Sequence, residues 1–142
     1  MVMRNARRSL RLARGRWRSL GRAMGELVIA RVRLRTDHSH LLLNAKPTRR
    51  APRVPLTSDQ ERLVDQVAFA IPRVSPRIPW RADCLVQALA AERWLRHCGI
   101  ASQVVIGVKV DGPASLDAHA WLEAGGRIVT GGDIAAFVPL AD

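Results

Sequence analysis

Two residues in this chain have the types and settings that nucleophilic catalysis needs, Cys84 and His119. A cysteine attacks a carbonyl as its thiolate, and the unpaired amides at a helix N-terminus stabilise that anion. Cys84 follows Asp83, a good N-cap residue, and opens a helical pattern that runs to Cys98. A histidine on a neighbouring hairpin can approach such a helix end and remove the thiol proton. The sequence therefore predicts a cysteine–histidine pair for acyl transfer.

The first turn of the predicted helix also offers groups that can stabilise charge. The backbone amides of Cys84 and Leu85 are expected to stabilise the oxyanion formed by attack on an amide carbonyl. Cys98 lies roughly 21 Å away along the helix axis, at ~1.5 Å per residue, so these two cysteines form neither a disulfide nor a metal site. The sequence has no Cys-x-x-Cys or His-x-x-x-His spacing, and we expect no metal and no cofactor.

Strands that could present the histidine follow the cysteine helix. Alternating apolar residues predict a strand over 100–110, and two shorter strands over 118–124 and 127–130 are joined by two glycines that suit a hairpin turn. The pattern is that of an α+β domain, with the cysteine helix packed on a small antiparallel sheet. Trp80 and Trp121 lie close in sequence to the predicted pair and are candidate walls of a substrate cleft.

The chain before residue 57 resembles an appendage to one catalytic domain. Residues 1–43 form a basic amphipathic helical segment, whose apolar stripe packs on the domain's own core or docks on a partner, a membrane or nucleic acid. Residues 44–56 are rich in proline and arginine and suit an extended linker. Residues 57–142 form the domain, which opens with the capping-box pair Ser58 and Glu61.

The basic charge of the chain is confined to its N-terminal part. The formal net charge is +11, but residues 1–53 hold fifteen Lys/Arg against two acids (+13), and residues 54–142 hold eight against ten (−2). A nucleic-acid-binding scaffold is therefore an alternative for the appendage rather than for the domain. The early apolar run is too short for a secretory signal or a membrane span, and an Arg-rich transit peptide is a compositional alternative. We expect a cytoplasmic bacterial protein without membrane association.

Three segments, in this order and at these separations, resemble the lasso-peptide biosynthesis B2 proteins over about residues 57–133. They are Cys84-Leu85-Val86-Gln87-Ala88-Leu89 with its continuation to Gly99-Ile100, Val105-Ile106-Gly107-Val108, and Ala118-His119-Ala120-Trp121-Leu122-Glu123. The resemblance implies a leader peptidase with a transglutaminase-like, papain-related fold and a Cys-His-Asp triad. It also implies three partners: a lasso precursor peptide, a leader-binding B1 protein and a lasso cyclase.

Asp133 is the nearest candidate for the third triad member that the resemblance implies. Counting outward from the hairpin turn places Gly132 opposite His119, so Asp133 faces the other way unless a bulge or turn redirects it. Gly131 and Gly132 make such a deviation easy. Asp117, a backbone carbonyl or a water are the alternatives, because the third group only orients the imidazole and stabilises its cation.

The predicted function is removal of the leader from a lasso-peptide precursor by thioester chemistry on Cys84 and His119. A transglutaminase-like acyltransferase is the first alternative, because the same residues can pass an acyl group to an amine instead of water. A non-catalytic basic scaffold for nucleic acid is the second alternative.

Overall fold

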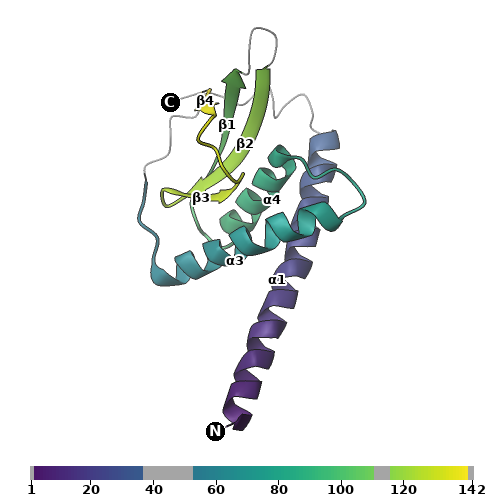
Figure 1. The fold of residues 1–142 in the computed structure, drawn as a ribbon, viewed down its shortest axis with the longest axis vertical. Helices are drawn as coiled ribbons and strands as arrows, with labels where there is room; N and C mark the ends of the chain where they lie inside the picture. Colours follow the sequence, from purple (N-terminus) through teal and green to yellow (C-terminus); the bar gives the residue numbers. More distant parts are fainter. Residues whose placement is uncertain (1, 37–52, 111–115, 141–142) are drawn as a thin grey trace.

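The computed structural model describes residues 2–36, 53–110 and 116–140 and has the predicted α+β architecture (Figure 1). In chain order, its elements are α1 (Val2–Thr36), α3 (Ser58–Val74), a 3-10 turn (Ser75–Arg77), α4 (Cys84–His97), β1 (Gln103–Val110), β2 (Leu116–Ala124), β3 (Arg127–Thr130) and β4 (Val138–Pro139). The strands form one antiparallel sheet in the order β3-β2-β1-β4. The three helices pack together, and α4 lies against β2.

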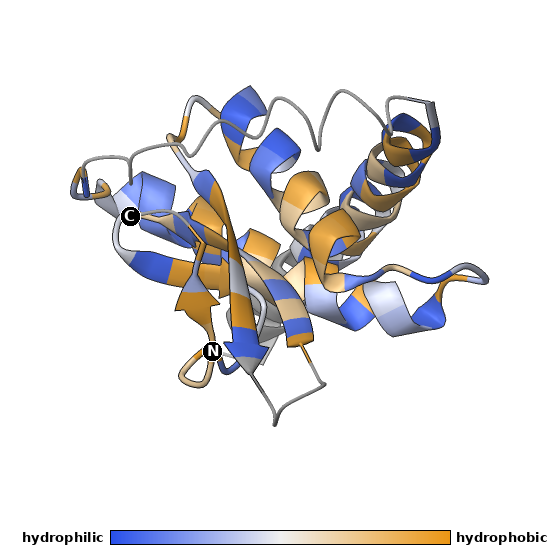
Figure 2. Cartoon of the chain, turned by 90° about the horizontal axis from the view of Figure 1, so that it is seen from above, coloured by the Kyte–Doolittle hydropathy of each residue, from blue (hydrophilic) through white to orange (hydrophobic). Residues whose placement is uncertain are grey.

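The sheet has a helix-covered face and an opposite face. Ala120, Leu122 and Ala124 of β2 join the hydrophobic core with the helices. Because side chains alternate along a strand, Trp121 belongs to the other face, and His119 leaves β2 from that face near the edge where β3 stops, within reach of a pocket that α4 also lines. Hydrophobic and hydrophilic residues alternate along the strands in the view of Figure 2.

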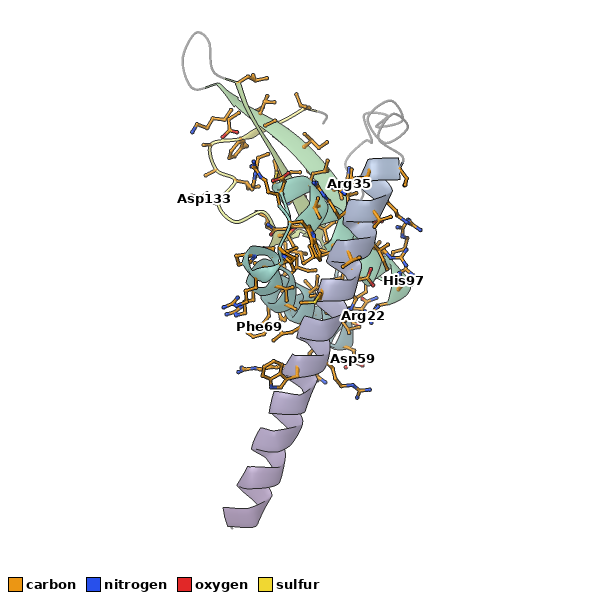
Figure 3. All side chains as sticks on the ribbon, turned by 90° about the vertical axis from the view of Figure 1, so that its right-hand side faces the viewer. Arg22, Arg35, Asp59, Phe69, His97 and Asp133 are labelled. Carbon is orange, nitrogen blue, oxygen red and sulfur yellow. The ribbon has the colours of Figure 1, made fainter. Side chains whose placement is uncertain are left out.

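The second half of α1 is part of the core. Ala23, Leu27 and Ala30 are buried among residues of α3 and α4, at steps of three and four that place them on one helix face. The first part of α1 projects away from the rest of the molecule (Figures 1 and 3). The expected division into helical segment, linker and domain stays a prediction. The hydrophobic core contains residues of α1 as well as residues of the helices and strands that follow residue 57. Residues 44–52 of the expected linker lie outside the described residues.

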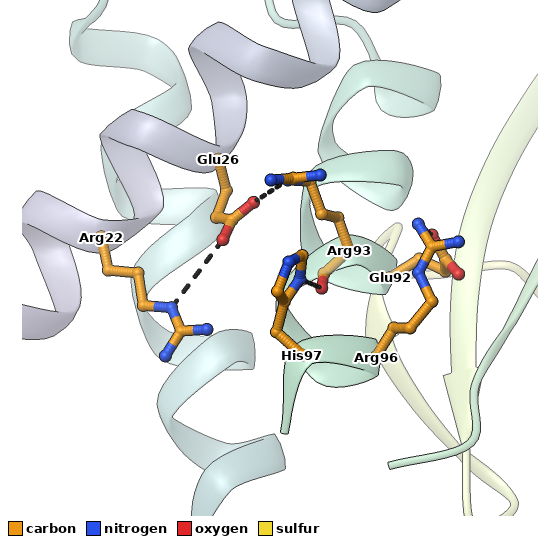
Figure 4. A network of polar contacts seen from close by, with 6 residues as sticks. All are labelled: Arg22, Glu26, Glu92, Arg93, Arg96 and His97. Atoms are coloured by element: carbon orange, nitrogen blue, oxygen red, sulfur yellow. Dashed lines mark hydrogen bonds and ion pairs between the residues drawn. The ribbon is translucent and has the colours of Figure 1, made fainter. Parts of the chain in front are cut away.

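A buried ion pair fastens α1 to α4 (Figure 4). Arg93 Nε lies 2.9 Å from Glu26 Oε2, and both side chains are largely shielded from solvent. Arg22 Nε approaches the other oxygen of Glu26 at 3.8 Å, and its guanidinium lies over the Trp94 ring. These contacts fix the position of the helix that carries Cys84 at its opposite end.

The capping box of α3 begins one residue earlier than predicted. Thr57 is the N-cap, its hydroxyl accepts from the Gln60 amide, and the Gln60 side chain accepts from the Thr57 amide. Both Thr-x-x-Gln and Ser-x-x-Glu satisfy the pattern, so the predicted pair of Ser58 and Glu61 was a one-residue error in register.

Candidate active site

Cys84 is the first residue of α4, as its sequence context predicts, and its thiol is free and half-buried. The N-cap is Asp83, whose carbonyl accepts the Gln87 amide at 3.0 Å. The Asp83 carboxylate makes no capping hydrogen bond and instead pairs with Arg81 at 3.4 Å. A capping side chain would occupy an amide of the first turn. Its absence leaves the amides of Cys84 and Leu85 available for an oxyanion.

His119 has a defined protonation pattern. Its Nε2 lies 2.7 Å from the Gly131 carbonyl oxygen. A carbonyl only accepts, so Nε2 carries the hydrogen and donates it. In the neutral tautomer that this contact favours, Nδ1 is the unprotonated nitrogen and the atom that could accept a proton. The backbone carbonyl was one of the alternatives that the sequence left open for this position.

Cys84 and His119 lie on the wall of the same pocket, which has a volume of about 480 Å³. The pocket opens where β3 stops, and its lining comes from α3, α4, β2 and the residues at and beyond the end of β3: Ala68, Pro72, Cys84, Gln87, His119, Ile128, Val129, Thr130, Gly131 and Gly132. No hydrogen bond joins the thiol to the imidazole within the described ranges. Catalytic hydrogen bonds often tighten only when substrate binds, so a shared pocket is the arrangement to expect without substrate.

Asp133 does not form the predicted hydrogen bond to His119. It is exposed on the loop beyond β3 (Figure 3), and its Oδ1 accepts the Ala135 amide at 3.0 Å. A bulge, one of the two deviations that could have redirected Asp133, is present but lies before the glycines, because Glu123 pairs with Ile128 whereas Leu122 pairs with Thr130. The strand nevertheless ends at Thr130, and Gly131 provides the acceptor instead. An orienting role for Asp133 stays a prediction.

Trp121 packs beside His119 and is not among the residues that line the pocket. It is fully buried, and its indole donates to Glu123 at 2.9 Å. Its ring stacks on His119 with centroids 6.3 Å apart, and Phe137 contacts the imidazole from another side at 4.9 Å. β2 places the Trp121 ring inside the protein, away from the lining of the pocket, and its part in a substrate cleft stays a prediction.

Two glycines make room for Trp121. A Cβ on Gly107 would lie 2.7 Å from the indole ring, and a Cβ on Gly131 would collide with the Trp121 side chain. Gly131 also has a φ of 112°, which only glycine adopts easily. Sequence reasoning recognised Gly131 as a flexible position but missed its role as the acceptor for His119.

Residues 24–142 match the family model of the transglutaminase-like superfamily. The chain belongs to this superfamily. Comparison with curated proteins gives no match, and comparison with solved structures gives none either. The match confirms the predicted fold class and the coarser part of the predicted function, because catalysis in this superfamily is usually cysteine-based.

Trp80 lies beside a second hollow of the transglutaminase-like domain, not beside the first. This hollow, of about 540 Å³, is lined by residues 75–76, 78–83 and Gln87. Gln87 also lines the pocket of Cys84, and its Nε2 donates to the Ala82 carbonyl at 2.9 Å. The two hollows therefore share Gln87 in their walls, and the role of Trp80 in a substrate cleft stays a prediction.

Two further properties of the transglutaminase-like domain follow from the described residues. Within 2–36, 53–110 and 116–140, no helix is both long and apolar enough to cross a membrane. In the same part of the chain, no group of three or more His, Cys, Asp or Glu side chains is placed to hold a metal ion.

Proposed function

We propose that this transglutaminase-like domain is a cytoplasmic cysteine peptidase that removes the leader from a lasso-peptide precursor. One observation carries the chemistry: Cys84, at a helix N-terminus without a side-chain cap, shares a pocket with His119, whose Nε2 is held by a carbonyl. The specific substrate rests on the resemblance of three segments to the B2 proteins.

The proposed reaction has two steps. Cys84 gives its proton to His119 Nδ1, and its sulfur bonds to the last carbonyl carbon of the leader. The amides of Cys84 and Leu85 stabilise the oxyanion, the carbon–nitrogen bond breaks, and His119 protonates the departing amine of the core peptide. Water that gives a proton to His119 then attacks the thioester, which releases the leader as a carboxylic acid and restores the thiol.

Recognition of the leader is proposed to rest largely on the B1 protein, because a domain of this size has little surface for a long peptide. The exposed face of α1 suits such a contact. It carries an apolar stripe at helical spacing, formed by Trp17, Met24, Val28 and Val32. The surrounding arginines favour an acidic partner. The amine that cleavage frees would then pass to the lasso cyclase.

Cleavage of the precursor with and without B1 tests whether B1 is responsible for recognising the leader. The proposal predicts that this chain alone cuts slowly and that B1 restores leader-specific cutting. Full-rate, leader-specific cutting by the chain alone would contradict recognition by B1. It would leave the proposed peptidase activity intact.

An acyltransferase remains the second candidate, because the superfamily uses the same cysteine chemistry for hydrolysis and for transfer. The two differ in the group that attacks the thioester. Product masses separate them: hydrolysis gives a free leader acid, whereas transfer gives a leader joined to an added amine.

A further inference from the structure

Thr130 is the most deeply buried polar residue on the wall of the catalytic pocket. It is 2% exposed, and its hydroxyl has no hydrogen-bond partner among the described residues. It nevertheless lines the same pocket as Cys84 and His119. A buried hydroxyl without a partner destabilises a folded protein, and such groups in native structures call for an explanation.

The bulge in β3 determines where this hydroxyl lies. In a regular ladder continuing from the pair Ala124–Arg127, Thr130 would face Trp121 and share its side of the sheet. The extra residue, Val129, shifts the register so that Thr130 pairs with Leu122. Leu122 packs against the helices, so Thr130 faces them as well. The bulge thus turns the Thr130 side chain toward the face of the sheet that α4 covers, and bulges are common next to active sites.

We propose that the Thr130 hydroxyl is a substrate-binding group that donates a hydrogen bond to a backbone carbonyl of the bound peptide. This inference rests on the proposed cysteine chemistry. The carbonyl belongs to the acyl half of the substrate, because that half stays attached to Cys84 through both steps and keeps the hydroxyl paired until the product leaves. The ligand class is therefore an extended peptide, recognised through its backbone and not through a particular side chain.

Ser102 offers a matched comparison within the same molecule. Its hydroxyl is also buried and has no partner among the described residues, but it lies on the wall of neither pocket. Ser102→Ala therefore removes a buried, unpaired hydroxyl, as a substitution of Thr130 does, but at a position outside both pockets.

Two active esters test the inference without a partner protein. p-Nitrophenyl acetate has no backbone amide, whereas the p-nitrophenyl ester of acetyl-Ala-Ala has two. In each, the Cys84 thiolate forms a thioester as p-nitrophenolate leaves. Thr130→Val, which keeps the shape and removes the hydroxyl, should lower kcat/KM for the peptide ester about tenfold. For the acetate, Thr130→Val should change kcat/KM by less than about twofold, and Ser102→Ala should leave both esters unchanged.

The outcomes separate this inference from the proposed function. If Cys84→Ala releases nitrophenolate from the peptide ester as fast as the native chain, the proposed function fails. If release depends on Cys84 but Thr130→Val turns over both esters normally, or slows both equally, the role of Thr130 fails. Should Thr130→Val not fold, Thr130→Ser and Thr130→Ala differ by the hydroxyl alone. For each variant, kcat/KM for the peptide ester is divided by kcat/KM for the acetate. The inference then requires this ratio to be about tenfold higher in the serine variant than in the alanine variant.

Discussion

At the scale of single residues, the Gly131 carbonyl has the clearest effect on the chemistry. By accepting from Nε2 it favours the imidazole tautomer in which Nδ1 is unprotonated, the atom that we propose as the base. Trp121 and Phe137 hold the ring from two further directions. The orientation of His119 thus depends on neutral groups, and within the described residues no carboxylate forms a hydrogen bond to its ring.

Gly131→Ala should lower catalysis as well as stability. The added Cβ collides with Trp121 at a backbone angle that disfavours alanine, so the carbonyl must move away from His119. We expect Cys84-dependent hydrolysis of p-nitrophenyl acetate to fall by about 10- to 100-fold, as for the loss of a group that orients a catalytic side chain. Gly132→Ala is the control, because it also has a positive φ but open space around it. Equal losses in both variants would mean that backbone strain alone is responsible.

Asp133→Asn should have a mild effect. The carboxylate accepts from the Ala135 amide, while His119 is held by Gly131. We expect kcat/KM for precursor cleavage to fall by less than about tenfold, because the asparagine oxygen can still accept that amide. A loss of about a thousandfold or more would instead establish Asp133 as the third triad member.

At the scale of elements, the attachment of α1 to α4 decides how firmly the catalytic helix is held. The Glu26–Arg93 pair is largely buried, so Glu26→Gln leaves a mostly shielded guanidinium without its anion. Unfolding in urea should show a loss of about 2–3 kcal/mol. Glu92→Gln breaks the more exposed pair with Arg96 and should cost about 0.5 kcal/mol or less. Similar costs for the two variants would show that α1 is not fastened by this contact.

The N-terminus of α3 provides a second measurement at this scale. Thr57→Ala removes the side-chain half of the capping box and should lower the free energy of unfolding by about 1 kcal/mol. Ser58→Ala removes the hydroxyl of the neighbour that the sequence pattern favoured, and its effect should be within about 0.5 kcal/mol. A larger loss for Ser58→Ala would place the cap at the predicted position after all.

Sequence reasoning located the elements better than the contacts between them. Apolar periodicity and a capping residue predicted the helix that begins at Cys84, and the glycine pair at 125–126 predicted the hairpin that carries His119. The burial of Trp121 depends on Gly107 of another strand, which local periodicity does not reveal. Similarly, counting residues along the hairpin raised the option of a bulge, but it could not show that β3 ends at Thr130 and that the Gly131 carbonyl then faces His119.

At the scale of the whole molecule, one helix has two faces with separate roles. The stripe of Ala23, Leu27 and Ala30 completes the core, while the stripe that includes Trp17 faces solvent. This division explains how a strongly basic segment can belong to a domain whose remainder is slightly acidic. The core face stabilises the fold, and the exposed face is the one that we propose for the contact with B1.

Trp17→Ser should separate these two roles. Trp17 is 75% exposed, so its loss should leave the melting temperature and the turnover of p-nitrophenyl acetate close to those of the native chain. Precursor cleavage in the presence of B1 should fall several-fold, since exposed tryptophans at interfaces often carry much of the binding energy. Unchanged B1-dependent cleavage would remove this face of α1 from the proposed contact.

The central claim is that Cys84 is the nucleophile and His119 is its base. The most direct test is the intact mass of the protein after acid quenching during turnover of p-nitrophenyl acetate, followed by peptide mapping. The account predicts one added acetyl group on Cys84, formed much more slowly in His119→Ala and absent in Cys84→Ala. An acetyl group on Cys98 instead, or acetylation of Cys84 at an equal rate without His119, would contradict it.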